Sequence, residues 1–140
     1  MACEVMAKRG VKDVINDDLF LYAGRQFDTL LFLMNGIGIT GTLLALENFL
    51  AHARTLLNPG GQLIFDSSDI AYLYEGGIQH PHEKYYGEIT YRYEYNGQEG
   101  AWFNWLYIDQ STLRGIALRC GWIMTVLFED DQDQYLVSLR

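Results

Sequence analysis

The residues best suited to contact a ligand are Met34, Asn35, Gly36 and Ile37, which follow the apolar run FDTLLFLM at its end. An asparagine side chain offers both a hydrogen-bond donor and an acceptor, and a glycine lets the backbone approach a ligand closely. Ligands of open α/β sheets bind at the carboxyl ends of the strands. We therefore expect a ligand-binding loop here, with a plain strand-to-helix turn as the alternative.

A second polar group closes the next apolar strand, which we expect from Gln62 to Phe65. Asp66, Ser67 and Asp69 follow it and should lie on the same rim of the sheet. They could orient the reacting group of a substrate. The Asp69 carboxylate could equally cap the turn that follows.

The segment His80-Pro81-His82-Glu83 contains side chains of metal-ligand type. The proline between the histidines and the lack of a third strong ligand argue against a metal site. A solvated loop is the better interpretation, so we expect no metal. Cys3 and Cys120 match no zinc or redox spacing and are interpreted as free thiols of a reducing compartment.

Aromatic residues make up 14% of the chain and crowd into residues 72–107. The alternation of apolar and polar residues from Ile89 to Tyr95 predicts a half-buried strand, and Asn96-Gly97 predicts a hairpin turn into a returning strand over 101–108. The aromatic residues of this hairpin could line an apolar or aromatic substrate pocket, or they could merely stabilise it by cross-strand pairing. They are Tyr91, Tyr93, Tyr95, Trp102 and Trp105.

Strands and helices alternate along the rest of the chain, which predicts an α/β fold with a mostly parallel sheet and an antiparallel pair at the C-terminal end. The expected helices cover residues 2–9, 42–57 and 110–120. The expected strands cover residues 11–16, 27–34, 62–65, 122–128 and 134–139. We expect the 27–34 strand to be covered on both faces, because it is continuously apolar. The 140 residues should form a single domain, with no linker long enough to divide it.

The net charge of −8 and the absence of a run of Lys and Arg exclude binding to a nucleic-acid backbone. The longest apolar run is too short to cross a bilayer, and the N-terminus lacks a secretory signal pattern. We expect a cytoplasmic protein with no membrane partner.

The order of these segments resembles class I S-adenosylmethionine-dependent methyltransferases. FDTLLFLMNGIGI, a helix, and LLNPGGQLIFDSSD are similar to the family's fourth and fifth strand units, with Pro59-Gly60-Gly61 leading into strand five. Residues 111–140 are similar to its last helix and its antiparallel strands six and seven. The resemblance implies a partial Rossmann-like domain over 1–140, with 72–108 as a variable insertion.

The chain departs from the family at the main cofactor motif. The Gly-x-Gly-x-Gly turn after strand one and the acidic residue ending strand two are absent, and neither Gly36-Ile37-Gly38 nor Gly76-Gly77 lies where it could replace them. The resemblance thus implies an N-terminally truncated domain that begins inside the helix after strand two. It also implies that Asp18 and Leu19 contact the adenine of S-adenosylmethionine, with an acidic turn in solvent as the alternative.

The implied activity is methyl transfer to a small molecule, weakened or lost in this chain, and no catalytic residue can be named. The alternative is an inactive domain that acts by self-association. In the family, strands one and two separate strands three and four, so the 27–34 strand would keep an unpaired apolar edge. We expect a homodimer across this edge. Otherwise the 11–16 strand could slide beside it.

Overall fold

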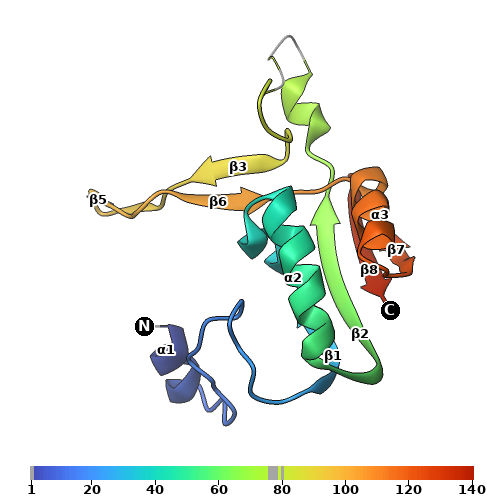
Figure 1. Cartoon of the computed structure of the whole chain (residues 1–140). Coiled ribbons are helices and arrows are strands. Elements are labelled where there is room, and N and C mark those ends of the chain that lie inside the picture. The colour runs from blue at the N-terminus through green and yellow to red at the C-terminus, as the bar shows by residue number, and fades with distance from the viewer. Residues whose placement is uncertain (1, 76–78, 80) are drawn as a thin grey trace.

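The computed structural model describes residues 2–75, 79 and 81–140. Its centre is a four-stranded sheet in the order β1-β2-β8-β7, whose strands are labelled in Figure 1. The strands are β1 (Phe27–Phe32), β2 (Leu57–Ser68), β7 (Met124–Glu129) and β8 (Gln134–Leu139). β1 and β2 are parallel, whereas β8 is antiparallel to both β2 and β7. The predicted α/β class with a mixed sheet is confirmed.

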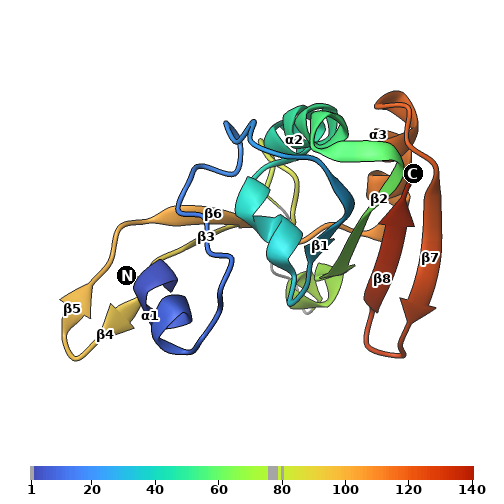
Figure 2. The ribbon, with the colours of Figure 1, turned by 90° about the horizontal axis from the view of Figure 1, so that it is seen from below.

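Two helices cover one face of this sheet, α2 (Leu43–Thr55) and α3 (Gln110–Arg119), as Figure 2 shows from below. Each begins at a side-chain cap: Thr42 Oγ1 accepts from Ala45 N at 3.1 Å, and Asp109 Oδ1 accepts from Thr112 N at 2.9 Å. Such caps satisfy amides that have no partner inside the helix. The core between helices and sheet is formed by fully buried residues, among them Leu46, Leu50, Leu63, Phe65, Leu113 and Ile116.

The opposite face of the sheet is open, so the expectation that the 27–34 strand is covered on both faces is wrong. Leu31 of β1, which is paired with Ile64 of β2, is 58% exposed. Phe128, at the far edge of the sheet, is 61% exposed. The strand is also shorter than expected, because Met34 and Asn35 have positive φ angles and turn the chain.

The first helix lies apart from the sheet (Figure 2). α1 (Ala2–Lys8) ends before Gly10, whose φ is +83°. The predicted strand over Val11–Asn16 is wrong, since the segment has no strand partner and is mostly exposed. A β-strand is stabilised by pairing its backbone groups, and β1 pairs only with β2 in the described part of the chain. The alternative in which this segment slides beside β1 is therefore wrong too.

A long hairpin projects from the carboxyl end of the sheet (Figure 1). It comprises β3 (Glu88–Tyr91), β4 (Glu94–Tyr95), β5 (Gln98–Glu99) and β6 (Phe103–Leu106). Tyr91 pairs with Phe103 and Glu94 with Glu99, so the returning side carries one extra residue at a bulge. The predicted turn at Asn96-Gly97 is confirmed, with φ angles of 50° and 73°. Two 3₁₀ turns, η1 (Gly36–Thr40) and η2 (Ala71–Tyr74), follow β1 and β2.

Candidate functional site

Asn35 joins three elements at the carboxyl ends of β1 and β2. Its backbone N–H donates to Asp66 Oδ2 at 2.8 Å, and its Nδ2 donates to the Leu106 carbonyl at 3.1 Å. Its Oδ1 accepts from Ser67 Oγ at 3.0 Å. The left-handed backbone of Asn35, with φ of 51°, is one that asparagine tolerates better than most residues. The turn is therefore held in one conformation by its own polar groups.

Ser67 connects the rim to the base of the hairpin. Its side chain is buried, with 2% of the residue exposed, and its Oγ accepts from Ile108 N at 3.1 Å. Both of its partners are therefore protein groups. Asp66 differs, since its Oδ1 is buried without a hydrogen-bond partner in the described part of the chain. This oxygen is an unused acceptor beside the Asn35 turn.

The other predicted residues of this loop divide between surface and core. Met34 is 92% exposed, whereas Ile37 is fully buried in the core. Gly36 lies between them and is half-buried. Met34, Asn35 and Gly36 can thus present side chain or backbone to a ligand, while the side chain of Ile37 packs inward.

Gly36, Gly38 and Gly41 form a Gly-x-Gly-x-x-Gly pattern directly after a strand, a pattern that the sequence analysis missed. This spacing is also that of a dinucleotide phosphate turn. Here Gly38 and Gly41 allow close packing against the hairpin: a methyl group at Gly38 would overlap the indole of Trp105, and one at Gly41 would press on Asn104. η1 and β6 are therefore tightly apposed.

Asp18 and Leu19 lie in the loop before β1. Asp18 Oδ1 accepts from Phe20 N at 2.8 Å, which makes a local acidic turn. The exposed Asp18 is followed by the half-buried Leu19, and Phe20 packs edge-on against Phe49 of α2. No hydrogen bond joins this loop to the Asn35 turn among the residues that the structure describes.

Asp69 caps η2, the alternative role that its sequence position left open. Its Oδ1 accepts from Ala71 N at 2.9 Å and from the Tyr86 hydroxyl at 2.6 Å. Nearby, the Tyr85 hydroxyl donates to Asp109 Oδ2 at 2.6 Å. Burial and this hydrogen bond raise the pKa of Tyr85 to about 12, and burial and Asp69 raise the pKa of Tyr86. Both tyrosines therefore stay protonated and cannot act as bases near neutral pH.

A cavity of about 230 Å³ lies on one face of the hairpin. It is lined by Tyr91, Arg92, Tyr93, Phe103, Trp105 and Tyr107. Of the five hairpin aromatic residues that could line a substrate pocket, this lining contains Tyr91, Tyr93 and Trp105. Trp102 is outside it and stacks under the Arg92 guanidinium at 5.0 Å.

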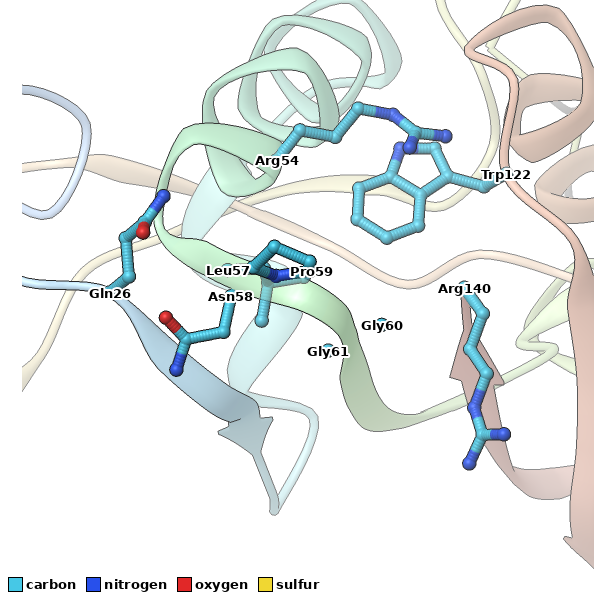
Figure 3. Close-up of a pocket in the computed structure, with 9 residues that line it drawn as sticks. All are labelled: Gln26, Arg54, Leu57, Asn58, Pro59, Gly60, Gly61, Trp122 and Arg140. Carbon is cyan, nitrogen blue, oxygen red and sulfur yellow. The ribbon is translucent and has the colours of Figure 1, made fainter.

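A larger hollow of about 600 Å³ lies at the other end of the sheet, around the turn that begins β2 (Figure 3). Its two arginines do not converge on one point. Arg54 stacks on Trp122 at 4.1 Å, whereas Arg140 points away and donates to Gln62 Oε1 at 2.8 Å. Because ligands of such sheets bind at the carboxyl ends of the strands, the Asn35 rim is the better candidate site.

Within residues 2–75, 79 and 81–140, no group of three or more His, Cys, Asp or Glu side chains is placed to hold a metal ion. Gly76, Gly77 and His80, which the sequence analysis considered, lie outside the described residues. No helix of the described chain is long and apolar enough to cross a membrane.

No protein-family model matches this sequence, and no curated protein matches it. Several solved structures, however, are similar to this chain. A SAM-dependent methyltransferase from Bacteroides fragilis, crystallised with S-adenosyl-L-homocysteine, is 40% identical, with a TM-score of 0.88 over 99% of this chain and 58% of that one. DhpI, in its complex with S-adenosyl-L-homocysteine, is 19% identical over 100% of this chain and 60% of its own, with a TM-score of 0.67.

A S-adenosylmethionine-dependent methyltransferase from Clostridium acetobutylicum is 12% identical over 98% of this chain and 68% of its own, with a TM-score of 0.62. The chain therefore has part of the Rossmann-like methyltransferase fold. It spans about three-fifths of the first two similar structures.

Proposed function

We propose that this chain is part of an S-adenosylmethionine-dependent methyltransferase that acts on a small molecule. The observation that carries the proposal is its 40% identity and TM-score of 0.88, over 99% of its length, to a methyltransferase crystallised with S-adenosyl-L-homocysteine. The Asn35 rim supports it, because it lies where open α/β sheets bind ligands and offers an unpaired Asp66 oxygen.

In this proposal the cofactor, S-adenosylmethionine, contacts Met34, Asn35 and Gly36 at the rim, and the buried Ile37 supports this turn from the core. Asp18 and Leu19 face its adenine, as the family resemblance implies. The acceptor lies over Asp66 and Tyr91. Ser67 contributes by holding Asn35 and Ile108, and Trp102 by supporting Arg92.

Methyl transfer rests mainly on proximity and in-line orientation of the two reacting groups. A dedicated side-chain base is therefore not required. We name none, and the protonated Tyr85 and Tyr86 fit this view. We further propose that residues 1–140 form one domain, with 72–108 as an insertion, and that it works in the cytoplasm.

We expect the 140-residue chain to bind the cofactor weakly, because its sequence contains no Gly-x-Gly-x-Gly turn. Losing a charged hydrogen bond and several amide contacts, at about 1–3 kcal/mol each, weakens binding by several orders of magnitude. Titration with S-adenosyl-L-homocysteine, followed by amide chemical shifts, should give a dissociation constant of about 1 mM or weaker.

The shifts should appear at 34–37 and at 18–19, while the amides of β7 serve as an internal control. A micromolar dissociation constant by calorimetry would contradict the weak-binding expectation. The absence of any shift at 34–37 under a large excess of S-adenosyl-L-homocysteine would contradict the cofactor site itself.

A second function, self-association of an inactive domain, is favoured by the exposed edge at β1. Leu31, Leu33 and Met34 are 58%, 53% and 92% exposed, and an apolar edge strand is a template for pairing with another chain. We propose a homodimer formed across this edge.

Light scattering should then give twice the chain mass at micromolar concentration, and Leu31→Lys should give the monomer. Leu127→Lys is the matched control, since Leu127 is 51% exposed on the opposite edge strand. A monomeric wild type, or equal effects of the two substitutions, would rule out this dimer.

A further inference from the structure

Aromatic side chains make up most of the lining of the hairpin cavity. Tyr91 and Tyr93 each stand near Phe103, with ring centroids 6.2 and 5.2 Å away and ring planes tilted by 34° and 31°. Trp105 stands edge-on to Phe103, at 6.3 Å and 85°. These rings pack on one another and present aromatic surface to the cavity, and such surface packs well against another flat ring.

The cavity is small, which suits a compact ligand. It measures about 230 Å³, whereas pockets for drug-sized ligands usually have about 300–1,000 Å³. One aromatic ring with small substituents fills such a space. A long or branched chain would leave part of its apolar surface in water.

The charges around the cavity favour a neutral ligand. Arg92 is its one charged lining residue, and both terminal nitrogens of its guanidinium bind Glu99, at 2.5 and 2.7 Å. An anion would have to displace Glu99, and a cation would approach a guanidinium. Burial and a hydrogen bond with Tyr107 raise the pKa of Tyr91 to about 12, so the tyrosine adds a neutral hydroxyl group.

The cavity adjoins the Asn35 rim through the end of β6 and the two residues that follow it. Its lining residue Tyr107 stands between Leu106, whose carbonyl accepts from Asn35, and Ile108, whose amide donates to Ser67. Trp105, another lining residue, packs directly on Gly38 of η1. A ring held in the cavity therefore lies next to the turn proposed to hold the cofactor.

We propose that this cavity binds a small, neutral, hydroxyl- or amino-substituted aromatic compound, the methyl acceptor of the enzyme. Its role as acceptor rests on the proposed function; its preference for flat rings does not. In the reaction, a lone pair of the substituent's oxygen or nitrogen forms a bond to the methyl carbon as the carbon–sulfur bond of S-adenosylmethionine breaks. S-adenosyl-L-homocysteine leaves, and the substituent's proton passes to solvent.

The test measures binding to the full 140-residue chain without cofactor. Catechol, cyclohexane-1,2-diol and tetramethylammonium are titrated separately, and the dissociation constants are taken from ligand-detected NMR and tryptophan fluorescence. Catechol and the diol carry the same two hydroxyl groups but differ in the flatness of the ring. Tetramethylammonium tests whether the rings form a cation cage instead.

Tyr93→Leu should weaken catechol binding about threefold to tenfold, the range expected for one lost aromatic contact. Tyr95→Leu is the matched control, because the two tyrosines are 76% and 77% exposed on the same hairpin and only Tyr93 lines the cavity. Because both side chains are exposed, neither substitution should disturb the fold, and circular dichroism of both variants checks this.

Tighter binding of catechol than of the diol, weakened by Tyr93→Leu alone, supports the proposal. The proposal is overturned if cyclohexane-1,2-diol binds as tightly as catechol or if tetramethylammonium binds more tightly. It is also overturned if Tyr93→Leu and Tyr95→Leu change the dissociation constant of catechol equally, or if a 10-fold molar excess of catechol over the chain gives no binding signal. If the chain binds catechol but S-adenosyl-L-homocysteine causes no amide chemical-shift changes, the proposed aromatic site is supported and the proposed methyl-transfer function is contradicted.

Discussion

Ser67→Ala tests whether the Ser67 hydroxyl holds the rim together or is free to meet a substrate. In the structure the hydroxyl donates to Asn35 Oδ1 at 3.0 Å and accepts from Ile108 N at 3.1 Å. Both Ser67 and Ile108 are buried, with exposures of 2% and 0%. The alanine variant removes both hydrogen bonds without adding atoms, so no steric effect accompanies the loss.

The expected destabilisation is about 2–4 kcal/mol. The hydrogen bond to Asn35 contributes about 1 kcal/mol, and leaving the buried Ile108 amide without an acceptor costs about 1–3 kcal/mol. Ser138→Ala is the matched control, because Ser138 is 4% exposed and its hydroxyl makes one bond, to Gln62 Oε1 at 3.1 Å. Its loss should cost about 1 kcal/mol.

Urea denaturation of the wild type and the two variants gives the free energies of unfolding. If the free energy of unfolding of Ser67→Ala is within about 0.5 kcal/mol of the wild-type value, or falls no more than that of Ser138→Ala, the Ser67 hydroxyl does not hold the rim together. If Ser67→Ala instead leaves the free energy of unfolding unchanged but abolishes binding of the methyl acceptor, the hydroxyl contacts the substrate, the role that its sequence position suggested.

Three further substitutions test the elements around the rim. Gly38→Ala should destabilise the chain by about 1–3 kcal/mol and shift the tryptophan fluorescence, because the new methyl group displaces Trp105. Gly115→Ala should instead stabilise it by about 0.5–1 kcal/mol, since this α3 glycine has room for a methyl group; a loss of stability there would contradict the packing described. Burial favours the neutral acid of Asp109, but hydrogen bonds from Thr112 and Tyr85 outweigh it and lower its pKa. The ionised carboxylate therefore stabilises the fold above the unfolded pKa of about 4, and this contribution is lost as pH falls through the lower folded pKa. Asp109→Asn should accordingly cost more at pH 7 than at pH 2 in thermal denaturation, and an equal cost at both would refute the ionised cap.

The elements that the sequence predicted well are those whose determinants are local. α2 and α3 each start at a residue whose side chain caps the helix, Thr42 and Asp109, and each has an apolar face at helical spacing. The Asn96-Gly97 turn follows from the ease with which both residues adopt positive φ. The mixed sheet followed from the alternation of strands and helices and the antiparallel pair at the C-terminal end, rather than from any single segment.

The errors arose where the outcome depends on distant parts of the molecule. Val11–Asn16 has the composition of a strand but no neighbour to pair with. The apolar run of β1 predicted two covered faces, yet Leu31 is 58% exposed. Ser67 was predicted to meet a substrate from its place in the sequence, and only the structure shows its two protein partners. The Gly-x-Gly-x-x-Gly spacing was visible, but its packing role depends on Trp105, 67 residues beyond Gly38.

The contacts of Leu106, Tyr107 and Ile108 bear on how the two proposed halves of the site stay aligned. The Leu106 carbonyl accepts a hydrogen bond from Asn35, and the Ile108 amide donates one to Ser67. Tyr107, between them, lines the aromatic cavity. The Tyr135 hydroxyl adds a third tie, donating to the Ile108 carbonyl at 2.5 Å. Transfer of a methyl group requires the acceptor to be held in line with the cofactor. In the proposed function, the ties at Leu106 and Ile108 hold the proposed acceptor cavity in a fixed position relative to the rim. A shift of the Asn35 turn would therefore move the base of the cavity with it.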